Sequence, residues 1–518
     1  MAADGNSFRR SGEVTRFDLP LGALLDDGRP APYRAAMART GKEFLQGLKD
    51  DRQIWVGSER VRDVAAHPAF AGAARSVAAL FDLQHEAADV CLMPDPETGE
   101  LINVSHIIPR SREDLVRRHA CLERIAEYSV GIMGRTPDYL NATVAGFAGR
   151  ADEWSINGNE RGAANLVAFH KEVARRDLSL THTIVQPTID KTRGDVPAAG
   201  DEVALHKVED TARGIVVRGA RILATLAPFS DELFVYPGAP LAAGTDDYAL
   251  AFSIPMATPG LKFLCRDSYS SAGNAFDHPL SSRFDEQDAF VIFDDVEVPR
   301  ERVFIDANLP VYNTVMTTGW QPNIMQQTSI RAQIKLEFAW GVATRMAEAI
   351  NAASGAGAEM LGEIWSYAEM TRAGVHSAEQ GAYEWGNGVW FPDGRPFRAL
   401  RPLLPLWFPR VNEIIRLLGS HNLLAAPTSA QLDDPSLRPL IDRFLRGAKD
   451  VTAEQRARIF RLAWDFVGSA LASRGEQYER FYLASSGRAF IRAQTFASPD
   501  RARRLIDRFL SEELVPGA

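Results

Sequence analysis

Apolar residues between residues 33 and 150 recur mostly at three- and four-residue spacing, which predicts helices. Thr40 and Glu43 match a capping box, in which a hydroxyl and a carboxylate satisfy each other's backbone donors. Ser111 and Asp114 match a second one. Both pairs therefore predict the first turn of a helix.

The helix that follows Ser111 carries apolar residues at helical spacing as far as Ile132. We expect it to end near Gly134, because glycine is a common helix stop and Pro137 cannot continue the helix. A further amphipathic helix is expected over residues 161–176.

Between residues 178 and 304 the pattern changes to short β-rich runs separated by turn signals such as GTDD and TPG. The runs are HTIVQPTI, VALHKVE, GIVVRGARILAT, ELFVYPG, YALAFSIPM, LKFLC and AFVIFDDVEV. About seven strands in this space predict a small barrel or sandwich. From about Asn323 onward, long segments with apolar stripes predict a helical bundle.

This order predicts a mostly helical α+β protein and argues against a doubly wound α/β fold. We expect a flexible arm over residues 1–32, an N-terminal helical domain over 33–177, a central β-domain over 178–310 and a helical bundle over 311–518.

The composition of the 518 residues is ordinary for a globular enzyme, with 46% hydrophobic and 24% charged residues, enough to bury a large core. A net charge of −9 disfavours nucleic acid as the main partner, since a phosphate-binding surface needs clustered cations. The N-terminus has no apolar core of a signal peptide, and no run approaches the roughly 18 apolar residues of a membrane span. We expect a cytoplasmic protein.

Several motifs of common chemistry are missing. Cys91, Cys121 and Cys265 are odd in number and far apart in sequence, so we expect no disulfide framework and no metal site. There is no dinucleotide-binding GxGxxG between a strand and a helix, no GxxxxGK[ST] and no GxSxG. If the chain performs redox chemistry, we expect its electrons to arrive on a carrier that is reduced elsewhere.

Two segments contain reactive side chains, and each segment has both a structural and a functional interpretation. The segment GRTPDY reads as a helix stop and turn, but it also presents Arg135, a forked donor, and Tyr139, a phenolic acid–base group. His182 lies in the apolar segment LTHTIVQP, where a core histidine is the simpler interpretation. The alternative is a neutral base or donor at a pocket, suited to drawing a phenol toward phenolate.

Three further segments are less specific. Residues 276–304 carry a dense pattern of charges and prolines. These residues either lie on the surface of a β-unit or form part of a functional site. Arg331 and Lys335 lie one helical turn apart. They either belong to a solvated helix face or bind an anion together. In YERFYLASSG, from Tyr478 to Gly487, we expect a helix to run into a small-residue loop, which is an ordinary helix end or a place where the backbone approaches a flat ring or a pyrophosphate.

Taken in order, these segments resemble the oxygenase components of the 4-hydroxyphenylacetate 3-monooxygenase family. The resemblance covers about residues 39–510. Its motifs are RTGKEFLQGLKDDRQIWVGSERVRDVAAHPAF, IPRSREDLVRR, GRTPDY, LTHTIVQP, HPLSSRFDEQDAFVIFDDVEVP, RAQIKLEF and FVGSALASRGEQYERFY.

The resemblance implies an acyl-CoA-dehydrogenase-like fold, with an N-terminal helical domain, a central β-barrel and a C-terminal four-helix bundle, usually in a homotetramer. It implies that a separate NAD(P)H-flavin reductase supplies FADH2 by diffusion, in keeping with the missing nicotinamide motif. The reduced flavin would react with O2 to a C4a-hydroperoxide, and its distal oxygen would pass to the carbon ortho to a phenol hydroxyl.

The resemblance also assigns site residues. Contacts to the phenol and the peroxide fall on Arg135, Tyr139 and His182. Contacts to FAD fall on His182, Thr183, Ile184, Val185, Thr188, Ile189, Asp190, Lys191, Thr225, Ala484, Ser485, Ser486 and Gly487.

The loop after Phe234, VYPGAPLAAGTDD, departs from the family at the hydroxyl pair that contacts an arylacetate carboxylate. We therefore expect a larger or neutral phenol, such as a biosynthetic intermediate or one carried on a protein. Three rivals stay open: an iron–sulfur dehydratase of the same superfamily, which needs two cysteines close in sequence; an acyl-CoA-dehydrogenase-type flavin oxidoreductase, which needs a carboxylate base; and a non-catalytic flavin- or phenol-binding scaffold.

Overall fold

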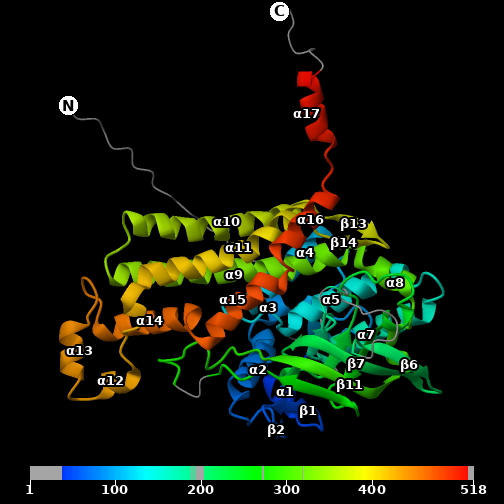
Figure 1. The fold of residues 1–518 in the computed structure, drawn as a ribbon, viewed down its shortest axis with the longest axis horizontal. Coiled ribbons are helices and arrows are strands. Elements are labelled where there is room, and N and C mark those ends of the chain that lie inside the picture. The colour runs from blue at the N-terminus through cyan, green and yellow to red at the C-terminus, as the bar shows by residue number, and fades with distance from the viewer. Residues whose placement is uncertain are drawn as a thin grey trace, which may run out of the picture.

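The computed structural model describes residues 38–187, 189–190, 192, 203–270, 274–317 and 319–510. The predicted arm over residues 1–32 lies outside this part of the chain. Figure 1 shows helices gathered along one side of the molecule and the main strands along the other, with N-terminal helices between them. Among the helices of the described residues, none is both long and apolar enough to cross a lipid bilayer.

The N-terminal region contains seven helices. They are α1 (Gly41–Gly47), α2 (Ala71–Glu86), α3 (Ala88–Cys91), α4 (Arg112–Tyr128), α5 (Pro137–Gly149), α6 (Ala151–Trp154) and α7 (Glu160–Arg176). The predicted capping box at the start of α1 is confirmed in both directions. At α4, Ser111 accepts from the Asp114 amide, whereas the Asp114 carboxylate accepts from the amide of Arg110 instead of that of Ser111.

Helix α4 ends earlier than predicted, at Tyr128 rather than near Gly134. Val130 and Gly131 both have left-handed backbone angles, with φ of 47° and 70°, and this ends the helix. A side chain at Gly131 would lie 2.5 Å from the carbonyl oxygen of Arg331, so the α9 backbone closes in at this point. Pro137 occupies the first turn of α5, where its missing N–H costs nothing.

All seven predicted β-runs overlap a strand, although β5 covers only the first two residues of HTIVQPTI. The strands are β5 (Leu180–Thr183), β6 (His206–Asp210), β7 (Gly214–Thr225), β8 (Glu232–Val235), β9 (Ala251–Pro255), β10 (Leu261–Cys265) and β11 (Asp288–Pro299), followed by β12 (Val303–Ile305). They form a four-stranded sheet ordered β12-β9-β8-β5 and part of a six-stranded sheet ordered β2-β1-β10-β11-β7-β6. A bridge between Val185 and Ile222 links the two sheets beside β5.

The first two strands of the larger sheet come from the region predicted to be mostly helical. These are β1 (Gln53–Val56), which runs parallel to β10, and β2 (Glu59–Val61), which pairs with β1 through a turn at Gly57. A second short hairpin joins β3 (Leu92–Pro94) and β4 (Leu101–Asn103). The helical prediction was wrong for these residues. Their alternation of apolar and polar residues is too short to stand out from the helical periodicity on either side.

The C-terminal region is helical, as predicted. It contains α8 (Leu309–Thr314), α9 (Trp320–Ala349), α10 (Ala356–Gln380), α11 (Gly394–Gly419), α12 (Ser429–Asp433), α13 (Arg438–Phe444), α14 (Ala453–Val467), α15 (Ala470–Tyr482), α16 (Ser486–Phe496) and α17 (Asp500–Leu510), and a hairpin of β13 (Tyr383–Gly386) and β14 (Val389–Phe391). Helices α9, α10 and α11 run side by side, with α14 and α15 beneath them, while α17 stands away from the body (Figure 1).

One buried apolar cluster runs through all three regions, from Phe44 through the strands to Leu483. A second cluster joins α5 and α7 to β5 and β8, and it contains Tyr139 and Tyr236. The residues predicted to carry the chemistry lie at this second cluster, where the N-terminal helices, the smaller sheet and α15 meet.

Candidate active site

The turn before α5 is held tightly from two sides. The backbone amides of Gly134 and Arg135 both donate to the buried carboxylate of Glu286, at 2.9 and 3.0 Å. A side chain at Gly134 would lie 2.6 Å from the Tyr478 ring, so only glycine fits beneath that ring. The turn therefore presents Arg135 from a fixed backbone, with Tyr139 on the first turn of α5.

The guanidinium of Arg135 lies between aromatic rings. Its central carbon is 4.0 Å from the centre of the Tyr139 ring, 4.2 Å from that of Tyr482 and 5.8 Å from that of Tyr478. A planar cation is stabilised over such ring faces. Its Nη1 is buried and has no hydrogen-bond partner among the described residues. A buried donor of this kind fits an oxygen atom of a bound molecule.

His182 joins this group from β5, far away in sequence. Its ring stacks on Tyr139 with 5.4 Å between the centres and lies 5.3 Å from the ring of Tyr236. Burial, together with the nearby Arg135 cation, holds the pKa of His182 well below its usual value. His182 is therefore neutral at physiological pH, so one ring nitrogen can accept a hydrogen bond.

The three residues predicted to surround the substrate are thus brought together by the fold. Sequence reasoning missed Tyr236, which follows β8 and is fully buried. Burial, together with Tyr139, raises the pKa of Tyr236 well above that of a free phenol. Nothing in the local sequence VYPG distinguishes this tyrosine from an ordinary core residue.

Tyr478 and Tyr482 lie within a segment that the sequence singled out, but not for these side chains. They lie one turn apart on α15, and their rings are 5.0 Å apart. The Tyr482 hydroxyl contacts the Thr328 hydroxyl at 3.1 Å and donates to the Gly134 carbonyl at 3.4 Å. Burial raises the pKa of Tyr482 to about 12, although Arg135 opposes the shift. The i, i+4 spacing of the two rings was the available signal.

Asp138 lies in the same turn and was not singled out. Its carboxylate accepts from the Gln327 amide at 2.9 Å. Burial raises the pKa of Asp138 to about 6, against the effect of hydrogen bonds from Thr136 and Gln327.

Most of the predicted flavin contacts on the β5 side are described. Thr183 is buried, and its hydroxyl donates to the Ile222 carbonyl at 3.2 Å, while the Ile184 carbonyl accepts from Arg221 at 3.0 Å. The side chains of Val185 and Ile189 are exposed, and the Asp190 carboxylate accepts from the amide and the hydroxyl of Thr192. Thr188 and Lys191 lie outside the described residues.

Thr225, at the end of β7, is buried and engaged on both sides. Its hydroxyl donates to Asp288 at 2.7 Å, and its carbonyl accepts from the Thr181 hydroxyl at 2.7 Å. Thr225 is thereby tied to the strand that carries His182.

The small-residue segment near the C-terminus is arranged differently from the expected loop. Ala484 has a left-handed φ of 73°, but Ser485 already caps α16, and Ser486 and Gly487 form its first turn. The prediction of a loop over all four residues was wrong, because the helix-compatible residues after Ser485 start a new helix, without a capping hydrogen bond from the serine side chain. Helix α16 therefore begins shortly after the end of α15.

Arg331 and Lys335 do form an anion clamp, but for a residue of the chain itself. Both donate to the buried carboxylate of Glu479, at 2.7 and 2.8 Å. Burial raises the pKa of Glu479, but the two cations outweigh it and lower the pKa to about 2. This cluster joins α9 to α15 and so fixes the helix that carries Tyr478 and Tyr482.

Metal-binding chemistry has no visible basis in the described part of the chain, which shows no group of three or more His, Cys, Asp or Glu side chains suited to a metal ion. Cys91 and Cys121 pack in one core cluster, whereas Cys265 lies at the end of β10.

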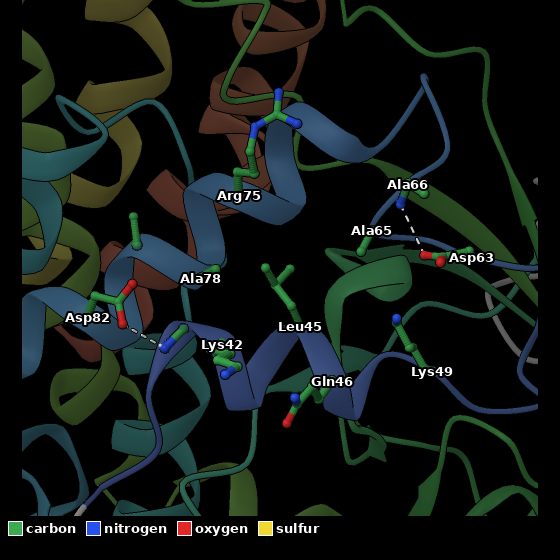
Figure 2. Close-up of a pocket in the computed structure, with 12 residues that line it drawn as sticks. Lys42, Leu45, Gln46, Lys49, Asp63, Ala65, Ala66, Arg75, Ala78 and Asp82 are labelled. Atoms are coloured by element: carbon green, nitrogen blue, oxygen red, sulfur yellow. Dashed lines mark hydrogen bonds between the residues drawn. The ribbon is translucent and has the colours of Figure 1, made fainter.

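A surface groove of about 610 Å³ lies between α1 and α2, as Figure 2 shows. Alanines and Leu45 line it, with Lys42, Asp63, Arg75 and Asp82 at its sides. Arg135, Tyr139 and His182 do not line this groove.

Two family models match the chain. The model described as 4-hydroxyphenylacetate 3-hydroxylase N terminal matches residues 40–305, and its C-terminal counterpart matches residues 311–511. The chain belongs to the 4-hydroxyphenylacetate 3-hydroxylase family. The predicted family is thereby confirmed.

Several characterised members of the 4-hydroxyphenylacetate 3-hydroxylase family are similar over nearly their whole length. The 4-hydroxyphenylacetate 3-monooxygenase oxygenase component of Thermus thermophilus is 37% identical, over 92% of this chain and 98% of the relative. The oxygenase component of a 4-nitrophenol 2-monooxygenase from Rhodococcus is 34% identical, over 89% and 88%. A Streptomyces globisporus monooxygenase, named for a chlorinated hydroxyphenyl substrate on a peptidyl-carrier protein, is 32% identical, over 90% and 88%.

Solved structures agree. A crystal structure of a 4-hydroxyphenylacetate 3-monooxygenase oxygenase component, complexed with FAD and 4-hydroxyphenylacetate, is 37% identical and superposes with a TM-score of 0.87, over 92% of this chain and 99% of the other. An archaeal 4-hydroxybutyryl-CoA dehydratase from N. maritimus has the same fold, with a TM-score of 0.83 over 93% and 96% at 17% identity. The predicted fold class is confirmed.

Proposed function

We propose that this protein is the oxygenase component of a two-component, FADH2-dependent monooxygenase that hydroxylates a phenolic substrate ortho to its hydroxyl group. The observation that carries the proposal is the convergence of Arg135, Tyr139 and a neutral His182 on one buried point. The family relatives are named as oxygenases of phenols, which supports the same reaction.

The residues present fit FAD. The first turn of α16, including Ser486 and Gly487, offers free amides of the kind that favour a phosphate group. We assign FAD to the segments His182–Val185, Thr188–Lys191, Thr225 and Ala484–Gly487. When bound, reduced FAD reacts with O2 to deliver one oxygen atom to the ring, while the other leaves as water and the flavin is oxidised to FAD.

The chain's own groups prepare the substrate. Neutral His182 accepts a hydrogen bond from the phenol hydroxyl, which draws the phenol toward phenolate and raises electron density at the ortho carbon. Arg135 and Tyr139 supply donors for the resulting phenolate oxygen. The buried rings of Tyr236 and Tyr478 and the half-buried ring of Tyr482 close the site, which excludes water from the reacting atoms.

We assign the far end of the substrate to the loop after β8, which is apolar and acidic. Residues 236–248 after β8 contain no lysine, arginine or histidine but include Asp246 and Asp247, which are exposed. The loop is pinned by Asn313, which exchanges two hydrogen bonds with the Leu241 backbone at 2.8 and 2.9 Å. Such a loop suits a neutral or enlarged phenol, including one attached to a carrier protein, better than a free arylacetate.

The partners that we propose follow from the same chemistry. A separate NAD(P)H-flavin reductase supplies FADH2, because the sequence carries no nicotinamide-binding motif. The oxygenase works as a homotetramer, which would cover the exposed apolar side chains of α17. We place both components in the cytoplasm, where NAD(P)H is produced.

The proposal is tested by loading the purified protein anaerobically with FADH2 and mixing it with oxygenated buffer and a panel of phenols. Flavin reoxidation is followed by absorbance, H2O2 by a coupled assay and catechol by mass spectrometry. We expect a catechol and little H2O2 with a suitable phenol. Rapid reoxidation with no catechol from any phenol would instead favour an acyl-CoA-dehydrogenase-type flavin oxidoreductase.

A further inference from the structure

Glu286 lies just before β11 and is fully buried, yet its carboxylate faces the active-site turn. It accepts from the Gly134 amide at 2.9 Å and from the Arg135 amide at 3.0 Å. Its other oxygen accepts from Arg474 of α15 at 2.7 Å. One carboxylate thus binds the N-terminal region, the β-region and the bundle together.

Arg474 also connects Glu286 to the strand that carries His182. Arg474 donates through two nitrogens to Asp288, at 2.8 and 2.6 Å. Burial raises the pKa of Asp288, but Arg474 and Arg266 outweigh it and hold the pKa well below its usual value. Asp288 in turn accepts from Thr225, whose carbonyl is bonded to Thr181 next to His182.

The position of Arg135 depends on its backbone. Its guanidinium is held by stacking on Tyr139 and Tyr482, and its buried Nη1 has no hydrogen-bond partner among the described residues. Ring faces hold a cation but define its direction weakly, whereas hydrogen bonds to an ionised carboxylate are directional. The two amide contacts of Glu286 therefore set where Arg135 points.

We propose that Glu286, anchored by Arg474, is a positioning residue for hydroxylation: it fixes the Gly134–Arg135 turn so that the donors of Arg135 and Tyr139 meet a phenol held against His182. The inference rests on the proposed function and adds a residue that touches neither substrate nor flavin. Loss of the Glu286 carboxylate should weaken binding of the phenol but not binding of the flavin. Thr225, which we assign to the flavin, is held by Asp288, and this contact does not involve Glu286.

The test uses Glu286→Gln in the full-length protein, which keeps the side-chain volume but turns one acceptor into a donor that opposes either the two amides or Arg474. The matched control is Asp95→Asn. Asp95 is also a buried carboxylate that holds two backbone amides, those of Glu97 and Thr98, and an arginine, Arg175, but in the β3–β4 hairpin. Both variants lose a similar clamp, and only one clamp lies at the site.

We expect catechol formation by Glu286→Gln to fall by about 100-fold, as for a misplaced reacting group, with the reoxidised flavin yielding H2O2 instead. Phenol affinity, measured by calorimetry without flavin, should weaken, whereas FADH2 binding should stay within about twofold, since small changes away from a contact cost little. Asp95→Asn should keep its coupling and phenol affinity even where its melting temperature falls. Arg474→Lys, which keeps the charge but loses the fork, should fall between the wild type and Glu286→Gln, and it carries the test if Glu286→Gln does not fold.

Equal coupling and phenol affinity in Glu286→Gln and Asp95→Asn, with a wild type that makes catechol, would overturn this inference alone. A wild type that binds FAD but makes no catechol from any phenol would overturn the proposed function, and the positioning role with it.

Discussion

The rings of Tyr139 and His182 stack with 5.4 Å between their centres and 23° between their planes, although one comes from α5 and the other from β5. This contact brings a phenolic donor beside an imidazole that Arg135 and burial keep neutral. It joins the motifs GRTPDY and LTHTIVQP. From local sequence alone, the first is explained as a helix stop and the second as a strand with a core histidine.

Removing the imidazole should uncouple the reaction. We expect His182→Ala to lower catechol formation by about 100-fold, the usual contribution of a positioned base, while the flavin still reoxidises and releases H2O2. His421→Ala, at an exposed histidine, is the control and should behave as the wild type. Product and H2O2 are measured in the same sample; normal coupling in His182→Ala would mean that another group takes the phenol proton.

The ring of Tyr482, rather than its hydroxyl, should matter to Arg135. Tyr482→Phe keeps the face over the guanidinium, so we expect near-normal coupling. Tyr482→Ala removes it and should lower catechol formation by about tenfold, in line with the roughly 1–2 kcal/mol of a desolvated cation–π contact. Steady-state rates of the two variants decide the point, and an equal loss in both would instead assign the effect to the hydroxyl and its bond to Thr328.

Acid should destabilise the protein through its buried histidines. Burial lowers the pKa of His170 to about 4, while the His106 carbonyl opposes this shift. Because the unfolded histidine binds a proton below about pH 6.5, stability is full above that pH and falls as pH drops toward 4, by about 2 kcal/mol at pH 5 for this residue alone.

His170→Gln keeps a donor for the His106 carbonyl but cannot titrate. Denaturant unfolding at pH 8 and pH 5 should therefore show a smaller loss on acidification for the variant than for the wild type. Asp138, whose pKa is about 6 in the folded protein, acts in the opposite direction in both proteins and cancels in the comparison. Parallel curves for the two proteins would show that His170 is not the titrating group.

Substrate charge should decide affinity at the loop after β8. We expect the methyl ester of 4-hydroxyphenylacetate to be hydroxylated with a kcat/KM at least about fivefold above that of the free acid. The loop that we assign to the far end of the substrate carries Asp246 and Asp247 but no cation, and a carboxylate beside such charges costs on the order of 1 kcal/mol. The ester and acid differ only in charge and one methyl group, so each controls for the other. Preference for the acid would point to a cation at the site and to an arylacetate as the substrate.

The outer face of α17 should hold the assembly together. Leu505, Ile506, Phe509 and Leu510 lie on one face of this helix and are exposed in the single chain. We expect Phe509→Asp to shift the protein from a tetramer to smaller species in light scattering, while Asp507→Asn on the same helix leaves the mass unchanged. A tetramer in both variants would place the subunit contacts elsewhere.

The amino-acid sequence alone determined the kinds of element and their order. The seven strand runs, the capping box at Thr40 and the helices of the C-terminal half follow from periodicity and end signals, which act over a few residues. The same local motifs carried the family resemblance, and with it Arg135, Tyr139 and His182.

Only the tertiary structure decided which residues surround that group. Tyr236 and Glu286 come from the β-region and Tyr482 from the bundle, and they meet at Arg135 and His182 because sheets and helices pack there, not because of any spacing along the chain. The early end of α4 and the new start of α16 likewise depended on contacts and backbone angles that no periodicity reveals. Packing brings distant residues together, and local pattern carries no information about that distance.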